Sequence, residues 1–285
     1  MQQFTYYRPE NKADLLNILS GCDGRVLAGG TDILPRMRKG FRFEETLVDI
    51  SRVKEFDFID ASESEICIGS LATYNKIVTS RELQEAAPIL ISAAAVVGSH
   101  QTRQRGTIGG NIGNASPAGD ILLPLLALDA EVVLVSQAGE RRLALKDFIT
   151  GPGRTALQKG EVIARICFAK PEEGTRYFFH KQGKRNAMAC SIVNMAMVAS
   201  FTGDRVKDIR IAFGSVAPKP VRCSATEDLV RDHVLNDGLI ELASLSALEE
   251  TSPICDVRAT AEYRKTLVRQ LVKRGLKYVS GIKEL

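Results

Sequence analysis

The sequence predicts an α+β protein of two domains, and three observations predict it. In residues 1–172, short apolar strands alternate with helices and with glycine-rich turns. In residues 173–285, three β-rich stretches come first and helices follow. The polar sequence Pro171-Glu172-Glu173-Gly174 separates the two patterns and contains the turn-forming residues proline and glycine. We therefore expect one domain over residues 1–172 and a second over residues 173–285.

The elements expected in the first domain follow from apolar periodicity and from turn residues. Strands are expected at 25–28, 46–50, 65–69, 131–137 and 162–168. Helices are expected at 12–19, 33–38, 74–78, 81–97 and 122–128. Thr31 or Asp32 is the expected N-cap of the helix at 33–38, and Thr73 is the expected N-cap of the next helix. Residues 100–106 are expected to form a loop before a second glycine turn.

The second domain is expected to begin with a three-stranded antiparallel sheet and to end in helices. The three strands are expected at 176–180, 191–201 and 206–213, and helices from about Ser224. The last helix, at about 259–279, places Val268, Leu271, Val272 and Val279 on one face. Its basic residues, among them Arg264, Arg269, Lys273 and Lys277, fall largely elsewhere and are expected in solvent.

The composition excludes several classes of protein. With 285 residues, 45% hydrophobic and 25% charged, the chain is typical of globular proteins. Its 38 basic and 34 acidic residues are interspersed, so no basic block is suited to nucleic acid. The longest mostly apolar run, Ala86 to Val97, is shorter than the about 20 residues that a membrane-spanning helix needs. Residues 1–10 lack the features of an export signal, so we expect a cytoplasmic protein that binds neither nucleic acid nor membrane.

The cysteines and histidines do not form a metal-binding pattern. The six cysteines are scattered at Cys22, Cys67, Cys167, Cys190, Cys223 and Cys255. Because they show no ligand spacing, we expect buried, reduced thiols. His100, His180 and His233 lie far apart in the sequence. No metal centre is expected in this chain.

The first glycine turn is Val26-Leu27-Ala28-Gly29-Gly30-Thr31-Asp32-Ile33, between an expected strand and an expected helix. Two residues without side chains let backbone N–H groups approach an anion, and the helix that follows adds its positive end. This arrangement suits a diphosphate. Taken alone, the motif is equally consistent with a tight strand-to-helix turn.

The second glycine turn is Thr107-Ile108-Gly109-Gly110-Asn111-Ile112-Gly113-Asn114, and the sequence Ser116-Pro117-Ala118-Gly119-Asp120 follows it. It adds clustered glycine backbone, a hydroxyl group and carboxamides, so two such turns together favour a bound nucleotide. The Asp120 carboxylate would be repelled by a diphosphate and is expected to face hydroxyl or ring N–H donors. Alternatively, Asp120 caps the apolar helix after it.

Together, Ala28-Gly29-Gly30-Thr31-Asp32, Thr107-Ile108-Gly109-Gly110-Asn111 and Ser116-Pro117-Ala118-Gly119-Asp120 resemble the FAD-binding medium subunits of molybdenum hydroxylases. This family includes bacterial xanthine dehydrogenase and carbon monoxide dehydrogenase. The resemblance covers essentially the whole chain. It implies a vanillyl-alcohol-oxidase (PCMH)-type FAD-binding domain over residues 1–172, with lobes at about 1–60 and 61–172. Residues 173–285 would then be the C-terminal domain of the medium flavin subunit.

The resemblance also assigns residues to the cofactor, which it implies is non-covalently bound FAD. Val26 to Ile33 and Thr107 to Asn111 would hold the diphosphate, and Asp120 would contact the polyol or ring. Val97, Ile163 and Lys181 would line the remainder of the site. A cation at Lys181 would favour the anionic reduced flavin and tune the cofactor. The alternative for Lys181 is an exposed lysine on a strand.

The segment Gln182 to Ala189 corresponds to the part of the family that covers the flavin. Its Lys184 and Arg185 suit an acidic dinucleotide acceptor. Met188 stands where carbon monoxide dehydrogenases tend to have tyrosine, and this difference favours a purine-oxidising, xanthine dehydrogenase-like enzyme.

The resemblance implies two partner subunits and an electron acceptor. A large subunit would carry molybdopterin and a small subunit two [2Fe–2S] clusters, and electrons would pass through FAD to NAD+ or another acceptor. The alternatives are a stand-alone vanillyl-alcohol-oxidase-type oxidoreductase, or the flavin subunit of a carbon monoxide, nicotinate or other heterocycle dehydrogenase. Residues 151–156 match the dinucleotide fingerprint of nicotinamide-dependent dehydrogenases, but the strand expected from Val162 leaves little room for the required helix.

Overall fold

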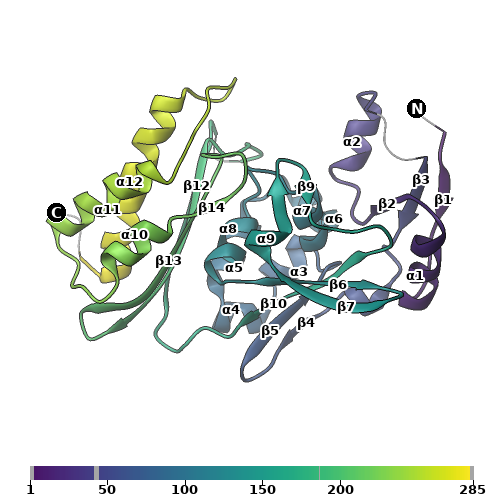
Figure 1. Cartoon of the computed structure of the whole chain (residues 1–285), viewed down its shortest axis with the longest axis horizontal. Helices are drawn as coiled ribbons and strands as arrows, with labels where there is room; N and C mark the ends of the chain where they lie inside the picture. Colours follow the sequence, from purple (N-terminus) through teal and green to yellow (C-terminus); the bar gives the residue numbers. More distant parts are fainter. Residues whose placement is uncertain (1–2, 42–44, 186, 283–285) are drawn as a thin grey trace.

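The computed structural model describes residues 3–41, 45–185 and 187–282 and has a mixed α/β architecture (Figure 1). The N-terminal strands and helices lie at one end of the molecule, and the C-terminal helices lie at the other. No helix among the described residues is long and apolar enough to cross a membrane.

A small parallel sheet forms the N-terminal end of the molecule. Its strands, in the order β1-β3-β2, are Thr5–Tyr7, Thr46–Asp49 and Gly24–Leu27. Helix α1 (Lys12–Gly21) buries Leu15 and Leu19 in a core cluster with Val48. Helix α2 (Ile33–Arg38) begins where the sequence predicts, but Asp32 makes no capping hydrogen bond. Asp32 instead pairs with Arg36 one turn later.

A five-stranded antiparallel sheet lies next to it. Its strands, in the order β4-β5-β10-β6-β7, are Ile59–Ala61, Glu65–Gly69, Val162–Ala169, Glu131–Ser136 and Gly139–Ala144, and the 3-10 helix η1 (Lys54–Phe56) precedes β4. Strand β7 was not expected, because its charged sequence has no apolar alternation and it pairs only at the edge, with β6. Residues 149–155 form the hairpin of β8 (Ile149–Gly151) and β9 (Arg154–Thr155). No helix follows the glycines there, which excludes the dinucleotide fingerprint.

Short helices connect these strands, and three of them correct the sequence-based expectations. The helices are α3 Tyr74–Val78, α4 Arg81–Ala86, α5 Pro88–Ala95, α6 His100–Arg105, α7 Ile108–Asn114, α8 Leu122–Ala127 and α9 Leu145–Phe148. The single helix expected at 81–97 is interrupted at Ala87, because a residue before proline disfavours helical geometry. The expected loop at 100–106 is helix α6, which Ser99 caps by accepting a hydrogen bond from the Thr102 backbone N–H. The expected cap at Thr73 is confirmed.

The C-terminal sheet has four strands rather than the expected three. Its antiparallel strands β11 to β14 are Arg176–Gln182, Val193–Thr202, Arg205–Gly214 and Val221–Arg222. Strand β14 was missed because only its pairing with β13 identifies so short a segment as a strand. One face of the sheet packs against helices α10 Ser224–Val230, α11 Asp237–Glu249 and α12 Ala261–Ser280 (Figure 1). Ala196, Val198 and Ala212, on the other face, join the core formed by α5 and α8.

Arg264 of α12 is buried, contrary to the prediction that the basic residues of this helix lie in solvent. Its guanidinium donates hydrogen bonds to the carbonyl oxygens of Ile192 and Ser215 and forms an ion pair with Asp256. The side chain is only 1% exposed. The two carbonyl acceptors lie 72 and 49 residues from Arg264 in the sequence, so the amphipathic pattern of the helix could not identify them.

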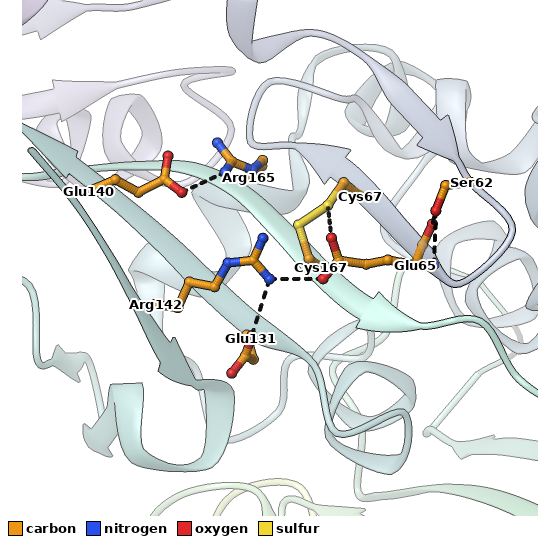
Figure 2. Close-up of a disulfide and its surroundings, with 8 residues drawn as sticks. All are labelled: Ser62, Glu65, Cys67, Glu131, Glu140, Arg142, Arg165 and Cys167. Atoms are coloured by element: carbon orange, nitrogen blue, oxygen red, sulfur yellow. Dashed lines mark hydrogen bonds and ion pairs between the residues drawn. A yellow bond between two sulfur atoms is a disulfide. The ribbon is translucent and has the colours of Figure 1, made fainter.

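Two cysteines are joined in a disulfide, which corrects the prediction of six reduced, buried thiols (Figure 2). Cys67 on β5 and Cys167 on β10 are directly opposite each other in the antiparallel register. Their sequence separation is 100 residues, so only the register of the sheet brings them together. Of the free cysteines, Cys223 is buried, Cys22 is partly exposed, and Cys190 and Cys255 are exposed.

Candidate cofactor site

A cavity of about 670 Å³ lies where the two glycine segments meet. The loop after β2, the start of α7, the β8–β9 turn and residues 157–163 form its walls. The volume falls within the about 300–1,000 Å³ typical of ligand sites.

The first glycine segment owes its shape partly to packing. A Cβ atom on Gly29 would lie 1.8 Å from the Arg105 carbonyl oxygen, so no side chain can be accommodated at this position. Gly30 has φ +73°, a conformation that favours glycine. The tight-turn interpretation therefore explains Gly29, while Gly30 both turns the chain and lines the cavity.

The second glycine segment is the first part of helix α7. Thr107 Oγ1 accepts a hydrogen bond of 3.1 Å from the Gly110 N–H, and the Gly109 N–H donates one of 2.9 Å to the Ser70 carbonyl. A Cβ atom on Gly109 would lie 2.5 Å from Ser70 Cβ, so this glycine is required by packing. Gly110 is exposed, and a Cβ atom there would be close only to Thr107 Oγ1. Gly110 is thus the position where the bare backbone faces the cavity.

Most residues predicted for the cofactor line this cavity. Those that do are Val26, Ala28, Gly29, Gly30, Thr31, Asp32, Ile33, Thr107, Gly109, Gly110, Asn111 and Ile163. Leu27 and Ile108 lie beside it in the protein core. Val97, Asp120, Lys181 and Met188 are not among the residues that line it.

Sequence reasoning missed one wall of the cavity, at residues 157–161. Glu161 accepts two hydrogen bonds from Arg141, of 2.6 and 2.8 Å, and one of 2.7 Å from the Gln158 N–H. The Arg141 hydrogen bonds hold the pKa of the Glu161 carboxyl below its usual range. This partly buried ion pair orients the segment, and Lys159 and Arg25 add positive charge to the cavity lining. No apolar periodicity or motif marks these residues in the sequence.

Asp120 and Lys181 form a buried polar network beside the cavity. Asp120 Oδ2 accepts a hydrogen bond of 2.6 Å from Lys181 Nζ. Asp120 Oδ1 accepts bonds of 2.7 Å from Ser191 Oγ and 2.8 Å from Asn194 Nδ2. Lys181 Nζ also donates to the Val96 carbonyl at 3.0 Å. The network therefore joins the segment after α7 to β11 and β12 of the C-terminal sheet.

This network excludes one alternative for each of its two charged residues, the helix cap for Asp120 and the exposed lysine for Lys181. Asp120 does not cap helix α8, because Ile121 is the N-cap residue and no side chain caps that helix. The Lys181 side chain is only 11% exposed, so it is not an exposed strand lysine. Both Asp120 oxygens already accept hydrogen bonds from protein donors, which a sequence pattern could not reveal.

Tyr74 and Asn111 connect the network to the cavity. Tyr74 is fully buried, and burial together with the negative charge of Asp120 raises the pKa of its phenol well above the usual value. The phenol therefore stays neutral at physiological pH. The Asn111 side chain hydrogen-bonds to Tyr74, while its Oδ1 atom is buried without a partner among the described residues.

The cavity suits a diphosphate-containing cofactor such as FAD. Ser70 Oγ, like Asn111 Oδ1, is buried in the cavity wall without a hydrogen-bond partner in the described part of the chain. Unpaired buried polar atoms are uncommon in folded proteins and indicate a missing water or ligand. Exposed glycine backbone at Gly110 and Gly113 lets a phosphate approach closely. The residues present therefore fit the cofactor that the sequence predicts.

The segment predicted to cover the flavin is closed at its base, where the Ile192 N–H donates a hydrogen bond of 2.7 Å to the Gln182 carbonyl. Lys184 donates to the Val257 carbonyl and Arg185 to the Met188 carbonyl. Met188 is 60% exposed and has φ +52°. Asn186, within the same segment, lies outside the described residues.

Two family models match the chain. Residues 2–170 match the FAD binding domain in molybdopterin dehydrogenase, and residues 178–279 match the CO dehydrogenase flavoprotein C-terminal domain. Together they cover nearly the whole chain.

Curated relatives and a solved structure agree with these matches. The medium chain of glyceraldehyde dehydrogenase from Sulfolobus acidocaldarius is 31% identical over 279 residues, which cover 98% of this chain and 99% of the relative. The xanthine dehydrogenase FAD-binding subunit of Escherichia coli O157:H7 is 30% identical over 95% of this chain and 94% of the relative. The structure of carbon monoxide dehydrogenase from Hydrogenophaga pseudoflava matches with a TM-score of 0.94 and 29% identity, over 98% of each chain.

Proposed function

Because the chain belongs to the family of FAD-binding medium subunits of molybdenum hydroxylases, we propose that it is the electron-transferring flavin subunit of a xanthine dehydrogenase-like complex. It is an FAD-dependent oxidoreductase subunit, as its relatives are. The observation that carries the proposal is the cavity between the two glycine segments, with bare backbone at Gly110 and unpaired polar atoms at Ser70 and Asn111.

In this proposal the chain binds FAD non-covalently. Backbone N–H groups of the segments 26–33 and 107–111 contact the diphosphate, and Ile163 contacts an apolar part of the cofactor. Asp120 and Lys181 lie next to Tyr74 and Asn111, on the side away from the cavity, and set the electrostatic potential at the flavin ring of FAD. When bound, FAD supplies the redox chemistry, taking electrons from iron–sulfur clusters of a partner and passing them to NAD+ or another acceptor.

The proposed complex contains two further subunits. A large subunit holds molybdopterin and selects the organic substrate, and a small subunit holds two [2Fe–2S] clusters. Residues 1–172 and 173–285 act as two domains, the first with lobes at about 1–60 and 61–172. Met188, at a position where carbon monoxide dehydrogenases tend to have tyrosine, favours a purine as substrate of the complex.

A second candidate within the same family is supported by the relatives, which include carbon monoxide and nicotinate dehydrogenase subunits. In that case the flavin site is unchanged and only the partner subunit differs. Substrate-dependent reduction of NAD+ by the complex purified from its native cell, tested with xanthine, nicotinate and carbon monoxide, separates the two candidates.

The flavin site itself is tested by Gly110→Asp in the purified chain. A carboxylate at this position repels the cofactor phosphates, and like charges in contact cost several kcal/mol, so FAD affinity should fall by about a hundredfold or more. Gly110→Asn adds similar bulk without charge and should lose less affinity. Gly238→Asp, in the first turn of α11 and outside the cavity, adds the same charge and should bind FAD normally. Full FAD occupancy of Gly110→Asp would contradict the placement of the site.

A further inference from the structure

The disulfide between Cys67 and Cys167 lies on a polar face of the five-stranded sheet (Figure 2). Along β5, the neighbours Ile66 and Ile68 point into the core, whereas Glu65 and Cys67 are partly exposed on the opposite side. A hollow of about 570 Å³ borders Cys167. Cys167 is buried, so a reagent in solution reaches the disulfide through Cys67, which is partly exposed.

Charged side chains surround the two sulfur atoms. Glu65 Oε2 lies 3.3 Å from Cys67 Sγ, and Glu65 Oε1 accepts a hydrogen bond of 2.8 Å from Arg142. Arg142 also pairs with Glu131, whose backbone lies opposite Cys167 in the sheet (Figure 2). The Arg142 guanidinium offsets the negative charge of Glu65, so that a thiolate can approach the partly exposed Cys67 sulfur.

The two strands that the disulfide joins both continue into the wall of the cofactor cavity. Strand β5 leads to Ser70, whose carbonyl accepts the Gly109 N–H at 2.9 Å and whose N–H donates to the Ala164 carbonyl at 2.9 Å. Strand β10 carries Ile163 in the cavity wall. The covalent link thus holds together the two strands on which the second glycine segment rests.

We propose that Cys67 and Cys167 form a thiol–disulfide exchange site that takes dithiols as its substrate class, and that its reduction loosens the cofactor cavity. The effect on FAD rests on the proposed function, whereas the exchange site itself does not.

The exchange balances with a dithiol as the reductant. Its thiolate attacks Cys67 Sγ, the more exposed sulfur, and the Cys67–Cys167 bond breaks, so that Cys167 leaves as a thiolate and takes a proton. The second thiol of the reductant then displaces Cys67 and closes a disulfide within the reductant. Two electrons and two protons have passed to the protein. In the reduced chain, the Cys67 thiol donates a hydrogen bond to Glu65 Oε2, and this hydrogen bond stabilises the reduced form.

Thiol counting tests the exchange site directly. Chain purified without reductant, unfolded in guanidinium and titrated with a chromogenic disulfide reagent, should show four thiols, because the sequence has six cysteines and two are paired. Incubation of the folded, FAD-loaded chain with dithiothreitol before the titration should raise the count to six. Six thiols before reduction, or four after it, would overturn the proposal.

The consequence for the cavity is tested by two further measurements. Reduction should speed the release of FAD, followed by its fluorescence, by about two- to thirtyfold, the range typical of coupling through contiguous packed elements. Hydrogen exchange in a peptide covering Gly109 should also accelerate, and this readout does not require FAD. The variant Cys67→Ser/Cys167→Ser should show the FAD release and hydrogen exchange of the reduced chain, and dithiothreitol should change neither.

The matched control is Cys190→Ser/Cys255→Ser, which removes two exposed, unpaired cysteines and should respond to dithiothreitol as the unmodified chain does. Equal rates of hydrogen exchange at Gly109 and of FAD release before and after reduction would refute the coupling between the disulfide and the cofactor cavity. A chain that binds no FAD would refute the proposed function. Thiol counting on the FAD-free chain would then still test the exchange site, and hydrogen exchange would still test its coupling to the cavity wall.

Discussion

Replacement of Asp120 by alanine is the most informative perturbation of this chain. Its carboxylate is 7% exposed and accepts hydrogen bonds from Lys181, Ser191 and Asn194. Among the described residues, Asp120→Ala leaves the buried Lys181 ammonium group with only the Val96 carbonyl as a partner. Removing one member of a buried ion pair typically costs about 3–5 kcal/mol. The free energy of unfolding should fall by this amount, a large part of the about 5–15 kcal/mol that stabilises a typical domain.

A double-mutant cycle separates the ion pair from its surroundings. Urea unfolding of the cofactor-free chain should be compared for Asp120→Ala, Lys181→Met and the double variant. The double variant should be more stable than Asp120→Ala, because no unpaired buried charge remains. An unchanged free energy of unfolding for Asp120→Ala, with a loss only of FAD affinity, would refute this reasoning. It would show that the carboxylate serves the cofactor rather than the contact between the glycine-rich region and the C-terminal sheet.

Three further predictions follow from the cavity and its surroundings. Gly29→Ala should lower the free energy of unfolding in urea by at least about 1–3 kcal/mol, because its Cβ atom would overlap the Arg105 carbonyl. Gly110→Ala, the control, should leave the free energy of unfolding nearly unchanged. Lys181→Met should lower the flavin midpoint potential in a redox titration, and Lys207→Met, which changes an exposed lysine, should not. An equal midpoint potential in Lys181→Met and the unmodified chain would contradict a role of Lys181 in tuning the flavin. The isolated chain should contain FAD but neither iron nor molybdenum by elemental analysis, and should reduce NAD+ with an organic substrate only after the two partner subunits are added.

Local sequence signals identified much of the fold correctly. The strand at Glu65–Gly69 and the helix at Ile33–Arg38 have the predicted bounds, and Thr73 caps α3 as expected. The helix and the cap depend on interactions between residues close in the sequence, and the strand is marked by its own apolar residues although it pairs with the distant strand β10. The glycine segments were identified for the same reason, since their motif is contiguous.

The errors arose where distant residues decide the structure. Strand β14 exists only because β13 pairs with it, and Arg264 is buried because the carbonyls of Ile192 and Ser215 approach it from other elements. The break at Ala87 was predictable in principle, since Pro88 follows it. The prediction of one helix over residues 81–97 relied on apolar periodicity and did not take this proline into account.

Contiguous motifs were enough to identify the family of this protein, its FAD cofactor and the two segments that line the cavity, because each depends on short runs of residues with distinctive chemistry. The charges that meet in the interior of the protein could be identified only from the folded chain. Lys181 of strand β11 meets Asp120 of the turn before helix α8, and Cys67 meets Cys167 through strand register across a separation of 100 residues. Ion pairs and disulfides require their atoms within a few ångströms of one another, and chain spacing does not specify such distances.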